Sequence, residues 1–131
     1  MKDLLEKINK LSEKRIDFYE NNDDKGFYKW SETYFKQIPE ELIEALDENK
    51  LNNSVYLEDE LWDVLWCYLC LLNWLKAEWK ITSVEKVFER SYKKFTWRLN
   101  EKTWENNWIW NEVKKIQKKE LKKENDLIYK R

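Results

Sequence analysis

Four carboxylates in two short motifs are the residues whose types and spacing could do chemistry. Glu41 and Glu44 lie in PEELIEALDE, and Glu60 and Asp63 follow in EDELWDVLWCYL. Residues three or four positions apart share a helix face, so each pair points in one direction. Two antiparallel helices carrying these pairs would bring all four carboxylates together. Carboxylates without histidine or cysteine are hard ligands, which predicts a Mg²⁺ site, with Mn²⁺ as the alternative.

The surroundings of Asp63 strengthen this interpretation. Asp63 is the only charged residue in the apolar run LWDVLWCYLCLLNWL, residues 61–75. Burying a carboxylate is unfavourable unless a partner or a metal compensates its charge. The competing interpretation is a solvated acidic helix face, because the chain has 26 acidic residues.

A magnesium site of this kind predicts phosphate chemistry, because Mg²⁺ keeps several waters and bridges to substrate phosphates. With no histidine in the chain, a glutamate is the best side-chain base for activating water. Trp30, Trp62 and Trp66 are candidates for stacking on a base, and the Asn73 amide for reading its edge. The alternatives are tryptophans packed in a core or dimer interface, and Asn73 as a core amide bonded to a neighbouring helix.

The elements that must position these residues are helical. One glycine and one proline among 131 residues leave few turn signals, and 39% of the residues are charged. We expect an all-α antiparallel bundle of four to five helices, near residues 2–20, 31–48, 54–79 and 82–99 and from 103 into the lysine-rich end. Ser31 is the expected cap of the second helix, Pro39 should kink or restart it, and Leu42, Ala45 and Leu46 should pack inward.

We expect one domain over residues 1–131, with a basic helix or tail at 114–131. That segment holds eight Lys or Arg and three acidic residues, but the net charge of the whole chain is −1. This charge balance argues against a nucleic-acid partner, and a solvated helix end is the preferred interpretation. The run 61–75 is too short to span a membrane, which takes about 20 residues. Cys67 and Cys70 are interpreted as buried apolar residues in a cytoplasmic protein without a secretory signal.

The paired acidic motifs resemble the MazG-type nucleotide pyrophosphohydrolases of the all-α NTP pyrophosphatase superfamily. Their signature is Glu-Glu-x-x-Glu, a spacer and Glu-x-x-Asp. The segment VEKVFERSYKKFTWRLN is similar to a later helix of that family, where Lys94 and Arg98 fall on its basic positions. Asn73 matches a recurrent Asn or Asp. The resemblance covers about Tyr34 to Arg98.

The resemblance implies a Mg²⁺-dependent enzyme that cleaves nucleoside triphosphates, canonical or deoxy, into a monophosphate and pyrophosphate. The implied metal ligands are Glu41, Glu44, Glu60 and Asp63. Glu40 would be the base that activates water or a group just outside the ligand set. Lys94 and Arg98 would hold the outer phosphates, unless they are ordinary surface charge. Homodimers or homotetramers with shared helices are also implied.

A non-enzymatic helical module is the alternative function. In that case the acidic residues would only be exposed, and the aromatic surface would bind a partner. A buried carboxylate at Asp63 has no use in such a module, which favours the enzyme.

Overall fold

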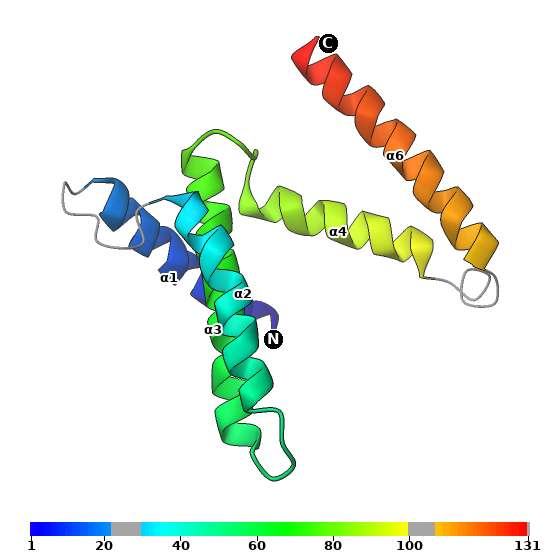
Figure 1. Ribbon diagram of the computed structural model, residues 1–131. Helices are drawn as coiled ribbons and strands as arrows, with labels where there is room; N and C mark the ends of the chain where they lie inside the picture. Colours follow the sequence, from blue (N-terminus) through cyan, green and yellow to red (C-terminus); the bar gives the residue numbers. More distant parts are fainter. Residues whose placement is uncertain (22–29, 100–106, 131) are drawn as a thin grey trace. The chain divides into compact units, whose positions relative to one another are not determined.

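The computed structural model describes residues 1–21, 30–99 and 107–130, and the regular structure in these ranges is helical throughout. The helices are α1 (Lys2–Glu20), α2 (Ser31–Asp47), α3 (Ser54–Ala77), α4 (Val84–Arg98) and α6 (Asn107–Tyr129) (Figure 1). The predicted all-α class is confirmed, and the helix ends lie close to the expected ones. Residues 103–106, where the last helix was expected to begin, lie outside the described residues.

The chain divides into two compact units, Met1–Val84 and Glu85–Arg131. The first contains α1, α2 and α3 with both acidic motifs, and the second contains most of α4 and all of α6. The single domain expected over residues 1–131 stays a prediction.

Helices α2 and α3 form an antiparallel hairpin in the first unit (Figure 1). The connection is short, and Asn52 adopts a left-handed conformation in it, with φ of 58°. Asparagine tolerates this conformation better than most residues. The Asn53 amide also donates to the Glu48 carbonyl at 2.9 Å. A tight, hydrogen-bonded connection fixes the register in which the two acidic motifs face each other.

Helix α1 packs against α3 and completes the core of this unit. The core combines apolar and aromatic residues from all three helices: Ile16, Tyr19, Tyr34, Cys67, Cys70, Leu71 and Trp74. The apolar run of α3 therefore becomes the central, buried part of the unit, while its acidic beginning stays near the surface.

The hairpin leaves several large apolar side chains exposed. Of the residues expected to pack inward, Ala45 is buried, but Leu42 and Leu46 are exposed, Leu46 to 68%. The prediction for these two leucines was wrong for the isolated chain. Ile43, Leu61 and Trp62 are exposed as well.

The start of α2 is stabilised by a residue from the end of α3. The helix begins at Ser31, so Ser31 is its first residue and not the preceding cap. The Ser31 backbone N–H donates to Glu78 Oε2 at 3.0 Å, and the Ser31 hydroxyl donates to Glu78 Oε1 at 2.8 Å. Glu78 thus places a carboxylate at the positive end of the helix dipole, where negative charge is favourable.

Proline 39 lies inside α2, which continues from Ser31 to Asp47. The helix therefore does not restart at Pro39, and the kink given as the other expectation stays a prediction. Proline removes one backbone donor, yet the helix is held at its start by Glu78 and along its length by packing on α3. Such tertiary contacts outweigh the local cost of one missing hydrogen bond.

The second unit is built from α4 and α6. Both guanidinium Nη atoms of Arg90 donate to the Glu124 carboxylate, at 3.2 and 2.7 Å. The Gln117 amide donates to the Lys94 carbonyl at 3.2 Å. Val113 and Gln117 are buried, whereas the six lysines of α6 are exposed, namely Lys114, Lys115, Lys118, Lys119, Lys122 and Lys123. Helix α6 is therefore amphipathic, with one face toward α4.

Both cysteines are free and buried, as the sequence predicted. Burial raises the pKa of Cys67 to about 11 and that of Cys70 to about 12. Both thiols are therefore protonated at neutral pH and serve as apolar packing. Among the described helices, none is long and apolar enough to cross a membrane.

Candidate metal-binding site

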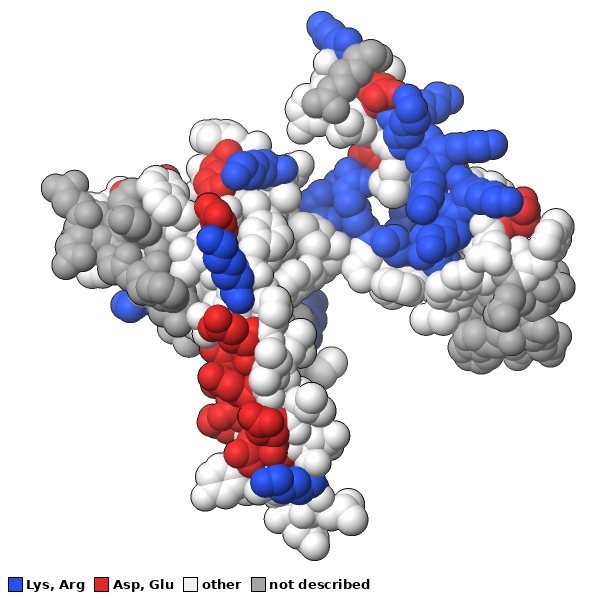
Figure 2. Space-filling view, in the orientation of Figure 1, with Lys and Arg blue, Asp and Glu red and all other residues white. Residues whose placement is uncertain are grey.

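Three carboxylates from two helices meet on the α2–α3 hairpin. Glu41 of α2 and Glu60 and Asp63 of α3 each place one oxygen within 4.8 Å of the others. Each of these residues is half-buried, so the cluster is shielded yet open to solvent. The predicted convergence of the two acidic motifs is confirmed for these three residues. Figure 2 shows the acidic side chains of the hairpin as a continuous red band.

Glu44 lies beside this cluster and interacts with it. It sits one helical turn after Glu41 and is exposed. A hydrogen bond to Glu41, followed by repulsion from the charges of Glu41, Glu60 and Asp63, raises the pKa of Glu44. Glu44 is thus close enough to interact electrostatically with all three members of the cluster.

The cluster is electrostatically unfavourable without a cation. Burial, then the charges of Glu41 and Asp59, raise the pKa of Asp63. Burial, then the charge of Asp63, raise the pKa of Glu60. A divalent cation would reverse this repulsion, because an adjacent positive charge favours the ionised carboxylates.

Gln37 orients one member of the cluster. Its amide Nε2 donates to Glu41 Oε1 at 2.7 Å from one turn earlier in α2. Sequence reasoning missed Gln37, although its spacing of four residues from Glu41 was the available signal. The hydrogen bond restrains the Glu41 carboxylate beside the other two members of the cluster.

The donor set fits Mg²⁺. Two oxygens bound to one Mg²⁺ at about 2.1 Å lie at most about 4.2 Å apart. The three cluster oxygens lie within 4.8 Å of one another. Small side-chain rotations would therefore bring them to the spacing of ligands on one Mg²⁺. Carboxylates without nitrogen or sulfur ligands favour Mg²⁺ or Mn²⁺ over zinc or copper.

Glu40 and Trp30 lie on another part of α2. Glu40 is exposed, and it borders a cavity of about 300 Å³ together with Trp30, Glu32, Thr33, Lys36 and Gln37. Trp30 is half exposed, and its ring centroid lies 5.8 Å from that of Trp74. Gln37 contacts both this cavity and the carboxylate cluster. The catalytic role of Glu40 and the base-binding role of Trp30 stay predictions.

Asn73 lies between α1 and α3 and is only 5% exposed. Its amide Nδ2 donates to Ser12 Oγ at 2.8 Å, to Asn9 Oδ1 at 3.2 Å and to the Leu69 carbonyl at 3.0 Å. These bonds are the ones expected of a core amide satisfied by a neighbouring helix. A nucleotide contact by Asn73 stays a prediction.

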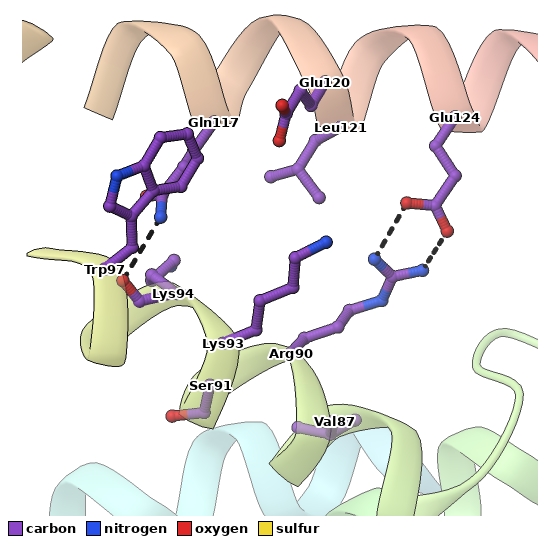
Figure 3. Close-up of a pocket in the computed structure, with 10 residues that line it drawn as sticks. All are labelled: Val87, Arg90, Ser91, Lys93, Lys94, Trp97, Gln117, Glu120, Leu121 and Glu124. Carbon is purple, nitrogen blue, oxygen red and sulfur yellow. Dashed lines mark hydrogen bonds and ion pairs between the residues drawn. The ribbon is translucent and has the colours of Figure 1, made fainter. Parts of the chain in front are cut away.

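Lys94 and Arg98 belong to the second unit. Arg98 is 8% exposed, its Nε donates to Gln117 Oε1 at 2.7 Å, and its guanidinium lies 5.6 Å from the Trp110 ring centroid. Lys94 is exposed and borders a groove between α4 and α6 (Figure 3). Their predicted contacts with phosphates stay predictions.

A cavity of about 340 Å³ adjoins the carboxylate cluster on the side of α1. Glu41 and Asp63 form one part of its wall, and the rest comes from Arg15, Tyr19, Tyr34, Trp66 and Cys67. The Arg15 guanidinium lies over the Tyr19 ring, 4.4 Å from its centroid. Sequence reasoning missed Arg15, because only the packing of α1 on α3 brings it near the acidic motifs.

Comparison with known proteins adds one positive finding. A family model described as "MazG nucleotide pyrophosphohydrolase domain" matches residues 30–103. This range contains both acidic motifs, Asn73, Lys94 and Arg98, but neither α1 nor α6. No curated protein and no solved structure matched the chain.

Proposed function

Because the chain belongs to the MazG nucleotide pyrophosphohydrolase family, we propose that it hydrolyses nucleoside triphosphates. The bond cleaved is the one between the α and β phosphates, and the products are a nucleoside monophosphate and pyrophosphate. The observation that carries this proposal is the meeting of Glu41, Glu60 and Asp63 within one small volume.

These three carboxylates and Glu44 would hold Mg²⁺, or Mn²⁺ in its place. The chemistry that a bound Mg²⁺ supplies is neutralisation of the triphosphate charge and polarisation of the phosphoryl oxygens. Attack on phosphorus needs this neutralisation, because the substrate is a polyanion. Repulsion within the unliganded cluster supports the assignment, since binding a cation relieves it.

The proton of the attacking water must go to a base. We assign this role to Glu40, which is exposed and next to Glu41 in sequence. Gln37 holds Glu41 from within the same helix, so the proposed proton acceptor Glu40 and the proposed metal ligand Glu41 belong to one segment of α2. A carboxylate can accept a proton in the transition state when it is correctly placed.

The triphosphate also needs positive charge at its outer end. Lys94 and Arg98 are our candidates for contacting these phosphates, and Trp30 and Asn73 for contacting the nucleoside. Support for the two basic residues comes from their position within the matched family range.

We further propose that the protein works as a homodimer or homotetramer in the cytoplasm. Exposed leucine, isoleucine and tryptophan side chains on α2 and α3 support self-association, because monomers rarely leave so much adjoining apolar surface in water. The two free thiols support a reducing compartment.

The test is a panel of canonical, deoxy and modified nucleoside triphosphates with Mg²⁺, scored for pyrophosphate release. Asp63→Asn should abolish this release, and Glu58→Gln is its matched control, because Glu58 is an exposed acid of α3 outside the cluster. Absence of pyrophosphate with every nucleotide, together with no thermal stabilisation by Mg²⁺, would favour the non-enzymatic module.

A further inference from the structure

The cavity between α1 and the hairpin has two chemically different ends. Glu41 and Asp63 form an acidic end, which belongs to the proposed metal site. Among the described residues of the wall, Arg15 of α1 is the cationic one. Within the described residues, Arg15 forms no ion pair with either carboxylate.

Arg15 lies toward the deeper turns of α3. Its guanidinium rests on Tyr19, a core residue that packs with Cys70 and Trp74. Burial raises the pKa of Cys70, and the charge of Arg15 is among the groups that oppose this rise. From Asp63 to Cys70 is about 10 Å along the helix, at 1.5 Å per residue. A ligand with phosphates at the acidic end therefore reaches Arg15 with its opposite end.

The walls between these ends suit a nucleobase. Tyr19, Tyr34 and Trp66 provide aromatic surface, against which a flat base can pack. A cavity of about 340 Å³ is near the small end of ligand sites. It can take a base with part of its sugar, which leaves the phosphates at the carboxylates.

The contact with the Tyr19 ring, 4.4 Å from the ring centroid, also restrains the Arg15 guanidinium. A planar fork held in one orientation donates two parallel hydrogen bonds and loses little entropy on binding. Among nucleobases, its best partner is an edge with two adjacent acceptors, as arginine binds O6 and N7 of guanine. Cytosine offers a similar pair in O2 and N3. Adenine has a donor beside N7, which such a fork rejects.

We propose that this cavity is the nucleobase subsite and that Arg15 selects bases with two adjacent acceptors, guanine or cytosine, over adenine. This inference rests on the proposed function, because the metal site fixes the position of the phosphates. Helix α1 lies outside the range matched by the family model. The selecting residue thus comes from a part of the chain that the family assignment does not cover.

The experiment compares binding of non-hydrolysable guanosine, cytidine, uridine and adenosine triphosphate analogues, in Mg²⁺, by titration calorimetry. We expect the wild type to bind the guanosine or the cytidine analogue about 10- to 100-fold more tightly than the adenosine analogue, the range for a bidentate contact. A 7-deaza guanosine analogue lacks N7 and should lose most of the guanosine advantage. A preference resting on cytidine alone would assign the subsite to O2 and N3.

Two variants test the residue itself. Arg15→Gln should abolish the discrimination, and Arg15→Lys, which keeps the charge but not the fork, should not restore it. Lys14→Gln is the matched control, because Lys14 is an exposed cation of α1 outside the cavity wall. Mg²⁺ binding and helix content should persist in Arg15→Gln, whose lost contact with Tyr19 should lower the melting temperature only slightly. These readouts separate loss of selection from loss of the site or fold.

Unchanged discrimination in Arg15→Gln, or no preference against adenosine in the wild type, would overturn the inference. So would loss of discrimination in Trp30→Leu but not in Arg15→Gln, since the base would then occupy the cavity on α2. Pyrophosphate release tests the function separately. Hydrolysis without Arg15-dependent selection leaves the function standing, whereas Arg15-dependent binding without hydrolysis supports the subsite and removes the function.

Discussion

Among the individual side chains, Asp63 links the proposed metal binding most directly to folding stability. It is half-buried, and its pKa is raised by burial and by neighbouring acidic groups. A group whose pKa is higher in the folded chain favours folding at low pH and opposes it at neutral pH. The proposed ligand set is therefore a source of instability that a bound metal removes.

Asp63→Asn separates function from stability. We expect at least about a 100-fold loss of Mg²⁺ affinity and turnover, because even groups that only support a metal ligand cost 10- to 100-fold. The melting temperature of the metal-free protein should rise at pH 7, since a repelled charge is removed. Calorimetry and pyrophosphate release measure the two effects, with Glu58→Gln as the unchanged control. A lower metal-free melting temperature in Asp63→Asn would contradict this account.

The pH dependence of stability provides a second check on the same carboxylates. Their contribution to folding is present below the ordinary carboxyl pKa of about 4 and is lost as pH rises through the raised folded-state values. In EDTA, the melting temperature of the wild type should therefore fall relative to Asp63→Asn as pH increases from about 4.5 to 7. Adding Mg²⁺ at pH 7 should reverse the difference. Parallel curves for the two proteins would argue against a repulsive cluster.

The sequence allowed the acidic side chains to be found, but not all of their neighbours. Glu41, Glu60 and Asp63 could be predicted because helical spacing and an apolar context are local properties. Arg15 could not, because its place in the cavity depends on how α1 packs against α3. The buried hydrogen bond of Arg98 to Gln117 was equally hidden, since it joins residues on two different helices.

At the level of the helices, too, some features could be predicted from the sequence and others depend on tertiary contacts. The approximate ends of the described helices followed from composition and apolar periodicity. The path of α2 through Pro39 did not, because Glu78 and the packing on α3 stabilise a helix that local rules would interrupt. The exposure of Leu42 and Leu46 also depends on which face of α2 packs against α3. Apolar periodicity alone does not specify that face.

Glu78→Gln tests the contact between the end of α3 and the start of α2. Although burial opposes it, hydrogen bonds from Lys80 and Ser31 lower the pKa of Glu78, so its stabilising effect is present near neutral pH and is lost as pH falls through the folded-state value. We expect a loss of about 1 kcal/mol at pH 7, similar to removal of a helix cap. Urea unfolding measures it, and Glu58→Gln should show no such loss. Equal stability of Glu78→Gln and wild type would exclude a capping role.

The contact between α1 and α3 can be tested through Asn73 and Ser12. Each single alanine variant should lose about 1–3 kcal/mol, because it leaves a buried polar group without its partner. Since the two side chains are hydrogen bonded at 2.8 Å, the double variant should lose less than the sum of the single losses, by at least about 0.5 kcal/mol. Additive losses would mean that this bond does not join the helices.

For the whole molecule, the proposed assembly depends on the exposed apolar face of the hairpin. Leu46→Glu introduces a charge there and should shift the protein toward monomer in analytical ultracentrifugation. Leu4→Glu is the control, because Leu4 is an equally apolar, exposed residue on α1. A monomeric wild type, or an unchanged mass for Leu46→Glu, would remove this face as the interface.

The near-zero net charge of the chain conceals two oppositely charged parts. Residues 1–84 hold 11 basic and 18 acidic residues, and residues 85–131 hold 14 and 8, which gives −7 and +6. Figure 2 shows Lys and Arg gathered over α4 and α6. Copies of such a chain attract one another in dilute buffer, where the screening length reaches about 30 Å at 0.01 M salt. We therefore expect solutions of the protein to become turbid on desalting and to clear when sodium chloride is added.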